Sequence, residues 1–254
     1  MNMTSILVFA VILAASFLFA MLGLGGGMVY VPLLKWAGYD LKTVAIPLGL
    51  LLNGLNTLLA LIPYARARLV DWGGALPMGL AATLAAPLGA WMMPRVPTHQ
   101  LLLLFAVAVI LAAWRMALTA GRAEPKALMA QSRRWLLGAV AGAAIGFLGG
   151  LLGIGGGFIV APLLMAMGYP TKMAAATTAY VVTFSSFSGF LGHAAEGQIP
   201  WQLAVISAGA VLLGSQFGAR YLTEKAKTPQ VKRIYAVVLV MIAIKLLFDA
   251  TRSG

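Results

Sequence analysis

Long apolar runs recur along the whole chain and are separated by short polar segments. A helix of about 20 apolar residues crosses the roughly 30 Å hydrocarbon core of a bilayer, and these runs reach that length. The strict alternation of apolar and polar residues that marks a membrane β-strand is not visible in them. The pattern therefore predicts an all-α polytopic membrane protein.

The apolar pattern occurs twice. Segment 22–34 reads LGLGGGMVYVPLL, and segment 152–164 reads LGIGGGFIVAPLL, 130 positions later. The match continues from AGYDLKTVA at 37–45 to MGYPTKMAA at 167–175. Collinear matches over a whole half indicate an internal duplication. We therefore divide the chain into a first transmembrane repeat at 1–120, a basic cytoplasmic linker at 121–134 and a second transmembrane repeat at 135–254.

Each repeat has the same predicted plan of four segments. A long apolar stretch that contains a run of glycines comes first, and three ordinary spans follow it. Internal repeats of this kind are typical of secondary transporters. The glycine-broken stretches cover 4–36 and 135–167, and the spans lie near 43–63, 73–93, 99–118, 173–193, 200–221 and 231–249.

The positions of Lys and Arg test how the broken stretches cross the membrane. If each stretch crosses once, the two sides carry nine basic residues each. If each enters and returns on one side as a hairpin, the count becomes thirteen against five. Because basic loops stay in the cytoplasm, the second arrangement is favoured. It places the two halves in inverted topology, both termini outside the cytoplasm, and loops 64–72, 115–134, 168–173 and 220–233 inside.

Composition agrees with a membrane protein. The chain is 61% hydrophobic and 9% charged, whereas a soluble domain carries about 25% charged residues. We assign the net charge of +12 to cytoplasmic loops and not to nucleic-acid binding. There is no cysteine, and His99 and His193 cannot form a zinc site alone, so no metal or other cofactor is expected. The N-terminus reads as a first membrane segment and not as a cleaved signal peptide.

The glycine runs are the first candidate for a functional site. Glycine permits a sharp turn, and backbone that turns within a membrane must be buried in protein or line a wet cavity. The short helix that follows each turn would offer unpaired N–H groups and partial positive charge to an anion. Tight helix packing is the alternative, and it is our interpretation of the ladder Gly138, Gly142, Gly146 and Gly150. The candidate substrate-binding residues are Gly25, Gly26, Gly27, Met28, Gly155, Gly156, Gly157 and Phe158.

Polar residues in the second span of each half are the second candidate. Asn53 and Asn56 lie 130 positions before Thr183 and Ser186, so both spans offer neutral hydrogen-bonding groups at equivalent places. Polar contacts that only hold helices together are the alternative. Gln216 is a weaker candidate. All six carboxylates fall in predicted loops or span ends, and no arrangement of side chains suggests an enzyme.

The duplicated motifs GLGGGMVYVPLL and GIGGGFIVAPLL, each opening a four-segment half, resemble those of the sulfite exporter TauE/SafE family of membrane permeases. The Gly-Ala pairs at 89–90 and 218–219 also fit, and the resemblance covers essentially the whole chain. It implies transport of a small sulfur-containing anion such as sulfite or sulfoacetate across the cytoplasmic membrane, usually as export. The two halves differ in one respect, because the first has Pro47 and Asn53 where the second is rich in Thr and Ser.

These observations lead to an expected function. We expect a multi-pass protein of the inner membrane that exports a small sulfur-containing oxyanion by alternating access of two inverted repeats. Its expected partners are the anion and the lipid bilayer, with a homodimer left open. The alternatives are an uptake permease for another small organic anion and a non-transporting membrane scaffold. The residues leave the anion, the direction and the coupling ion undetermined.

Overall fold

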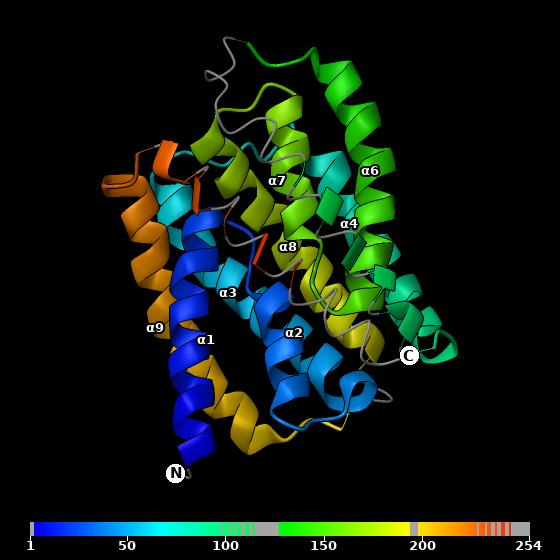
Figure 1. Cartoon of the computed structure of the whole chain (residues 1–254). Coiled ribbons are helices and arrows are strands. Elements are labelled where there is room, and N and C mark those ends of the chain that lie inside the picture. The colour runs from blue at the N-terminus through cyan, green and yellow to red at the C-terminus, as the bar shows by residue number, and fades with distance from the viewer. Residues whose placement is uncertain are drawn as a thin grey trace.

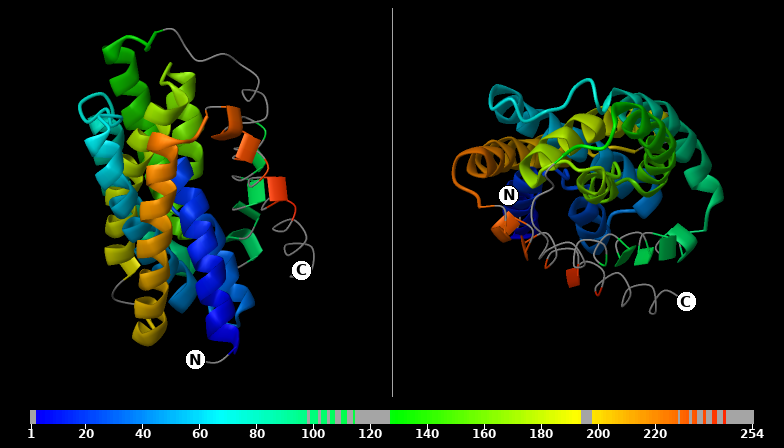
Figure 2. Two further views of the ribbon diagram at one scale, coloured as in Figure 1. Left: turned by 90° about the vertical axis from the view of Figure 1, so that its left-hand side faces the viewer. Right: turned by 90° about the horizontal axis from the view of Figure 1, so that it is seen from above.

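The structure is a computed structural model of the 254-residue chain. It describes residues 3–97, 127–193 and 198–227, together with single residues and short pieces between 99 and 114 and between 229 and 244. Every secondary-structure element among these residues is a helix. Most of the helices run along one common axis (Figure 2).

The helices follow the predicted spans closely. They are α1 (Met3–Leu22), α2 (Gly27–Trp36), the π-helix η1 (Leu41–Ala45), α3 (Ile46–Arg66), α4 (Leu76–Met92), the 3-10 helix η2 (Met93–Arg95), α6 (Gln131–Leu152), α7 (Gly157–Ala166), α8 (Thr171–His193) and α9 (Trp201–Glu224). Among the described residues, five helical segments are long and apolar enough to cross a membrane. These segments confirm the all-α membrane fold. The predicted spans 99–118 and 231–249, and most of the linker at 121–134, lie largely outside the described residues.

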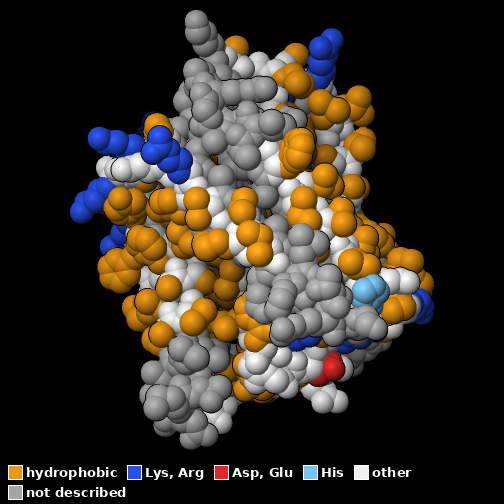
Figure 3. Space-filling view, viewed as in Figure 1, with side chains coloured by type: hydrophobic (Ala, Val, Ile, Leu, Met, Phe, Trp, Pro, Cys, Tyr) orange, Lys and Arg blue, Asp and Glu red, His pale blue; other side chains and the backbone are white. Residues whose placement is uncertain are grey.

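The exterior of the bundle is apolar. On α4 the side chains of Leu80, Leu84 and Leu88 are all more than half exposed and lie one helical turn apart. Figure 3 shows hydrophobic side chains across the middle of one face, with Lys and Arg gathered towards its edges. An exposed apolar belt of this kind is the surface that faces lipid in a membrane protein.

The two halves pack together through helices of one half that lie against helices of the other. The first long helix of each half lies against the third long helix of the other half, in the pairs α1–α9 and α4–α6. Helices α3 and α8 pack together between these pairs. A Cβ atom added at Gly89 would lie 2.0 Å from the Phe147 carbonyl oxygen, and one at Gly218 would lie 2.0 Å from that of Phe17. Because the same contact occurs at equivalent positions, the two helix pairs share one geometry.

The glycine ladder of α6 has the packing role that the sequence predicted. Cβ atoms added at Gly142, Gly146 and Gly150 would each fall within 2.4 Å of a backbone carbonyl oxygen of α4. Only glycine lets the two backbones come this close. The ladder therefore fixes the α4–α6 pair and leaves the glycine breaks as the candidates for function.

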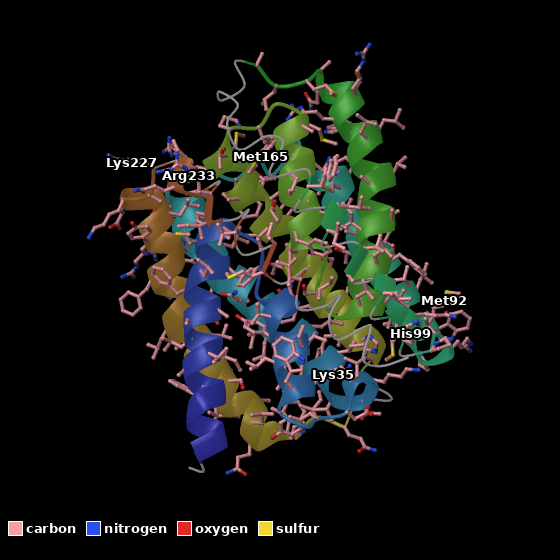
Figure 4. All side chains as sticks on the ribbon, in the orientation of Figure 1. Lys35, Met92, His99, Met165, Lys227 and Arg233 are labelled. Atoms are coloured by element: carbon pink, nitrogen blue, oxygen red, sulfur yellow. The ribbon has the colours of Figure 1, made fainter. Side chains whose placement is uncertain are left out.

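Each broken stretch returns to the end of the bundle at which it began. The Met129 N–H, just before α6, donates to the Met167 carbonyl, just after α7, over 2.9 Å. In the first half, α1 starts in the lower part of the molecule, where Lys35 near the end of α2 also lies (Figures 1 and 4). Helix α1 runs upward in Figure 1, whereas α6 runs downward. The orientation of the two halves in a bilayer stays a prediction.

A polar cluster joins three of the loops that the sequence places in the cytoplasm. Arg134 lies 2.8 Å from Asp71 and donates to the Tyr169 hydroxyl over 2.6 Å, and that hydroxyl donates to Asp71 over 2.8 Å. Partial burial raises the pKa of the Asp71 carboxyl, but hydrogen bonds from Gly74, Tyr169 and Arg134 and the Arg134 charge bring it net below its ordinary value. Burial and the neighbouring Asp71 carboxylate raise the pKa of Tyr169 to about 12.

Arg134→Gln tests the strength of this cluster. It leaves the partly buried Asp71 carboxylate without its cation, so we expect a loss of about 2 kcal/mol and a midpoint of thermal unfolding about 5 °C lower at neutral pH. The lowered pKa of Asp71 means that the stabilisation is fully present above its unfolded pKa of about 4 and is lost as pH falls through the folded pKa. The difference between wild type and variant should therefore shrink in acid.

Arg133→Gln is the matched control, because it removes the same charge from the exposed neighbouring side chain. Its midpoint should stay within about 1 °C of wild type, since exposed charges contribute little. Equal losses in the two variants would show that net charge, and not the Asp71–Arg134–Tyr169 contact, stabilises this end of the bundle.

Candidate functional site

The two glycine runs break their helices by adopting left-handed backbone. Gly25 has a φ of 70°, and Gly155 and Gly156 have φ values of 65° and 78°. Other residues rarely adopt this region, which is why the turn needs glycine. Helix α2 then begins at Gly27 and α7 at Gly157, one residue before the starts predicted near Met28 and Phe158.

The breaks lie deep inside the bundle. A Cβ atom added at Gly156 would lie 2.3 Å from the Ile145 side chain. Ile145 is well inside α6, about 21 Å from its first residue at 1.5 Å per residue. All residues from Leu24 to Met28 and from Ile154 to Phe158 are buried. The short helices therefore start in the interior, as a chain that turns inside a membrane requires.

The two breaks touch each other. A Cβ atom added at Gly27 would lie 2.8 Å from the Ile154 Cα, and one at Gly157 would lie 2.3 Å from the Leu24 carbonyl oxygen. Residues 27 and 24 of the first half match residues 157 and 154 of the second. The contact is thus reciprocal, and it brings the starts of α2 and α7 together at the centre of the molecule.

Asn53 on α3 connects the first break to the opposite half. Its Oδ1 atom accepts a hydrogen bond from the Gly27 N–H over 2.7 Å, and its Nδ2 atom donates to the Ser186 hydroxyl over 2.8 Å. A Cβ atom added at Gly155 would lie 2.2 Å from that hydroxyl oxygen. The structure thereby brings together two of the predicted polar residues and both breaks.

Thr183 and Gln216 make other contacts. The Thr183 hydroxyl lies 2.9 Å from the Thr57 hydroxyl and donates to the Ala179 carbonyl over 2.7 Å. The Gln216 amide, on α9, donates to the Leu59 carbonyl of α3 over 2.8 Å. Gln216 therefore links two helices, and among the described residues its hydrogen bond is to α3 and not to either break.

Asn56 differs from every other predicted site residue. Its side chain is completely buried, yet neither Oδ1 nor Nδ2 has a hydrogen-bond partner among the described residues. Leaving a buried amide unpaired costs about 1–3 kcal/mol for each polar group. An amide that the fold leaves unpaired is a candidate for binding something that the fold does not supply.

One buried polar pair was not predicted. The hydroxyls of Ser16 and Tyr30 lie 2.6 Å apart, and Ser16 also donates to the Ile12 carbonyl. The pair joins α1 to α2 behind the first break. The signal was a single Ser and a single Tyr inside apolar runs, where polar side chains usually face the protein interior.

Full charges lie away from the breaks. The described Lys, Arg, Asp and Glu residues fall in loops or near the ends of helices, and the middle turns of α3 and α8 carry only neutral side chains. Electrostatic attraction for an anion would therefore come from the starts of α2 and α7, each equivalent to roughly half a positive charge.

A cavity of about 430 Å³ lies between α1, Val29 of α2 and Met241, and its lining is almost wholly apolar. Its walls offer an anion nothing to bind. The polar centre at the two breaks is therefore the better candidate for a site that holds an ion.

An apolar exterior, helices of membrane-spanning length and a buried polar centre between two repeats define an integral membrane protein with the build of a transporter. The family model described as sulfite exporter TauE/SafE matches residues 8–246. The chain belongs to this family and is a membrane transporter.

Individual relatives agree with this assignment. The probable membrane transporter protein YunE of Bacillus subtilis is 26% identical over 92% of this chain and 94% of its own length. The probable membrane transporter protein y4hK of Sinorhizobium fredii is 27% identical over 91% and 93%. Sulfite exporter TauE/SafE family protein 3 of Arabidopsis thaliana is 34% identical over 30% of this chain and 16% of its own length. No solved structure matches the chain significantly.

Asn53→Leu and Asn56→Leu separate the structural amide from the unpaired one. Asn53→Leu removes the acceptor of the Gly27 N–H and the donor to Ser186, so we expect a loss of about 2 kcal/mol and a clearly lower midpoint of thermal unfolding. Asn56→Leu removes an amide that has no partner, and its midpoint should equal or exceed that of wild type. Thermal unfolding followed by tryptophan fluorescence in detergent measures both. Equal losses in the two variants would contradict this distinction.

Proposed function

We propose that the protein is a secondary transporter that exports a small sulfur-containing oxyanion, such as sulfite or sulfoacetate, from the cytoplasm. The observation that carries the proposal is the contact between the two glycine-broken helix starts at a buried, neutral, polar centre. The Arabidopsis relative is named a sulfite exporter, and the family description names the same activity.

The chemistry of the centre suits a small anion that must be both bound and released. Backbone N–H groups at a helix start bind anions, and neutral hydroxyl and amide groups complete the coordination. Because no fixed cation lies among the described residues of this centre, a bound anion forms no salt bridge that would hold it too tightly for release.

Alternating access follows from the duplicated build. The pairs α1–α9 and α4–α6 each combine helices from both halves, and α3 and α8 lie between them at the level of the breaks. Movement of one pair against the other would open the centre first to one side and then to the other. We assign this transporter to the inner membrane, and the positive-inside count supports an orientation with both termini outside the cytoplasm.

Flux of radiolabelled sulfite into proteoliposomes tests the function, with sulfoacetate, sulfate, thiosulfate and acetate as competitors and with or without a pH gradient. We expect saturable flux that sulfur oxyanions reduce more strongly than acetate does. Stronger competition by acetate would favour an uptake permease for organic acids. Folded protein that moves none of these anions would contradict the proposal and favour a scaffold.

Gly156→Leu tests the role of the breaks. Gly156 has a φ of 78°, and its Cβ would clash with Ile145. The α7 start must shift to accept a side chain, so we expect flux to fall by about tenfold or more. Gly209→Leu on α9 is the matched control, since a Cβ there meets no atom within 4 Å, and its flux should stay near that of wild type. Normal flux in a correctly inserted Gly156→Leu protein would rule out the breaks as the substrate site.

A further inference from the structure

The polar groups of the first half of the centre have hydrogen-bond partners that the equivalent groups of the second half lack. In the first half, Asn53 fills the space at the α2 start and pairs the Gly27 N–H with Ser186. The residues that correspond to these three by the 130-position repeat are Thr183, Gly157 and Asn56. The equivalent contacts would therefore join Thr183 to the Gly157 N–H and to Asn56.

Neither of these equivalent contacts is made. Thr183 instead bonds the Ala179 carbonyl and lies beside Thr57. The Gly157 N–H has no acceptor among the described residues, and both polar atoms of Asn56 are buried without a partner. Threonine is shorter than asparagine and carries one polar group in place of two. The second half therefore leaves unpaired the groups that Asn53 pairs in the first.

The Asn53 amide shows what would satisfy the second half. It offers an oxygen that accepts from a helix-start N–H and, two bonds away, an N–H that donates to the opposite helix. An oxyanion that keeps one proton has the same arrangement, with an oxygen that accepts and an O–H that donates. A fully deprotonated oxyanion offers only acceptors, and it would leave the Asn56 carbonyl unpaired.

The charge of the centre also favours an oxyanion that keeps one proton. Each helix start supplies roughly half a positive charge, so α2 and α7 together balance about one negative charge. No charged side chain lies in the middle turns of α3 or α8 to balance a second. The desolvation cost of an ion in a medium of low dielectric constant is large, and a second uncompensated charge raises it further.

We propose that the cargo is an oxyanion with one negative charge and one O–H, such as the hydroxyl form of hydrogensulfite, and that Gly157 and Asn56 are the groups that recognise it. This inference rests on the proposed function. The Gly157 N–H donates to one cargo oxygen, the Asn56 Nδ2 donates to another, and the Asn56 Oδ1 accepts the O–H. The cargo thus takes the place in the second half that the Asn53 side chain holds in the first.

Thr183→Asn is the first test, because it gives the second half its own copy of the Asn53 amide. The new side chain should pair the Gly157 N–H with Asn56, raise the midpoint of thermal unfolding by several degrees and lower sulfite flux by about tenfold or more. Added sulfite should stabilise wild type against heating but not the variant. Thr183→Ser is the control, and it should keep wild-type flux. A Thr183→Asn protein with normal flux and a normal sulfite-induced shift would overturn the inference.

The pH dependence of flux is the second test and uses the wild-type protein. With equal pH on both sides and a fixed subsaturating total concentration, sulfite flux should fall about tenfold per pH unit above the second ionisation of sulfite. Selenite loses its second proton at a higher pH than sulfite does. The pH at which selenite flux begins to fall should therefore be higher than that of sulfite, by the difference between the two second pKa values.

A difference in pH dependence between sulfite and selenite would show that protonation of the cargo, and not of a protein side chain, controls the flux. The titratable side chains on the helices packed against α3 are Tyr30, Tyr180, Tyr221, His193 and the Lys, Arg and Glu residues of the helix ends, with Tyr64 on α3 itself. Tyr30 pairs with Ser16, Tyr64 donates to the Ala20 carbonyl, and His193 contacts the Gly150 carbonyl. If one of these groups set the pH dependence, sulfite and selenite fluxes would begin to fall at the same pH, and that result would overturn the inference.

The role of Asn56 has its own comparison. Asn56→Leu should lower the flux of sulfite more than that of methanesulfonate, a monoanion without an O–H. Both anions lose the Nδ2 donor, but only hydrogensulfite also loses the Oδ1 acceptor of its O–H. Ser207→Ala removes another buried, unpaired hydroxyl and should not alter the ratio of the two fluxes. An unchanged ratio in Asn56→Leu would overturn the inference while leaving transport itself in place. If the wild-type protein moves no anion at all, both the proposed function and this inference fail.

Discussion

A backbone that turns inside a membrane must find its hydrogen-bond partners within the protein, and the rest of this structure depends on that constraint. The glycine runs at 25–27 and 155–157 make the turns, and the turns expose the first N–H groups of α2 and α7 in the interior. At the first break, Asn53 supplies the missing partner. At the second, the described residues supply none for Gly157. The same constraint that explains the packing therefore leads to the place where an anion can bind.

Both breaks lie at one centre because the helices of each half pack against those of the other. Because α1 packs on α9 and α6 packs on α4, each half is incomplete without the other, and the two helix starts meet where the halves join. Glycines at the α4–α6 and α1–α9 contacts hold the backbones close together. The centre is therefore built from tertiary contacts that neither half could make alone.

The apolar pattern was enough to predict the spans that the structure describes, and the starts of the two short helices to within one residue, because each of these is a local property of the chain. The sequence also identified Asn53 and Thr183, and Asn56 and Ser186, as equivalent positions of the two repeats. It could not show that Asn53 pairs with Ser186, because that contact depends on how α3 and α8 cross. Nor could it show that Asn56 lacks a partner, since an unpaired group is visible only once its neighbours are known.

Side-specific labelling of one cysteine tests the central claim most directly, because the natural chain has none. Ser186→Cys places a thiol beside Gly155, and Leu84→Cys on the exposed face of α4 is the control that should face lipid. If the two breaks form a substrate site with alternating access, a membrane-impermeant thiol reagent will modify Cys at position 186 from either side of sealed vesicles, and sulfite will slow both reactions. A Ser186→Cys protein that transports sulfite normally and yet reacts from neither side would contradict the account.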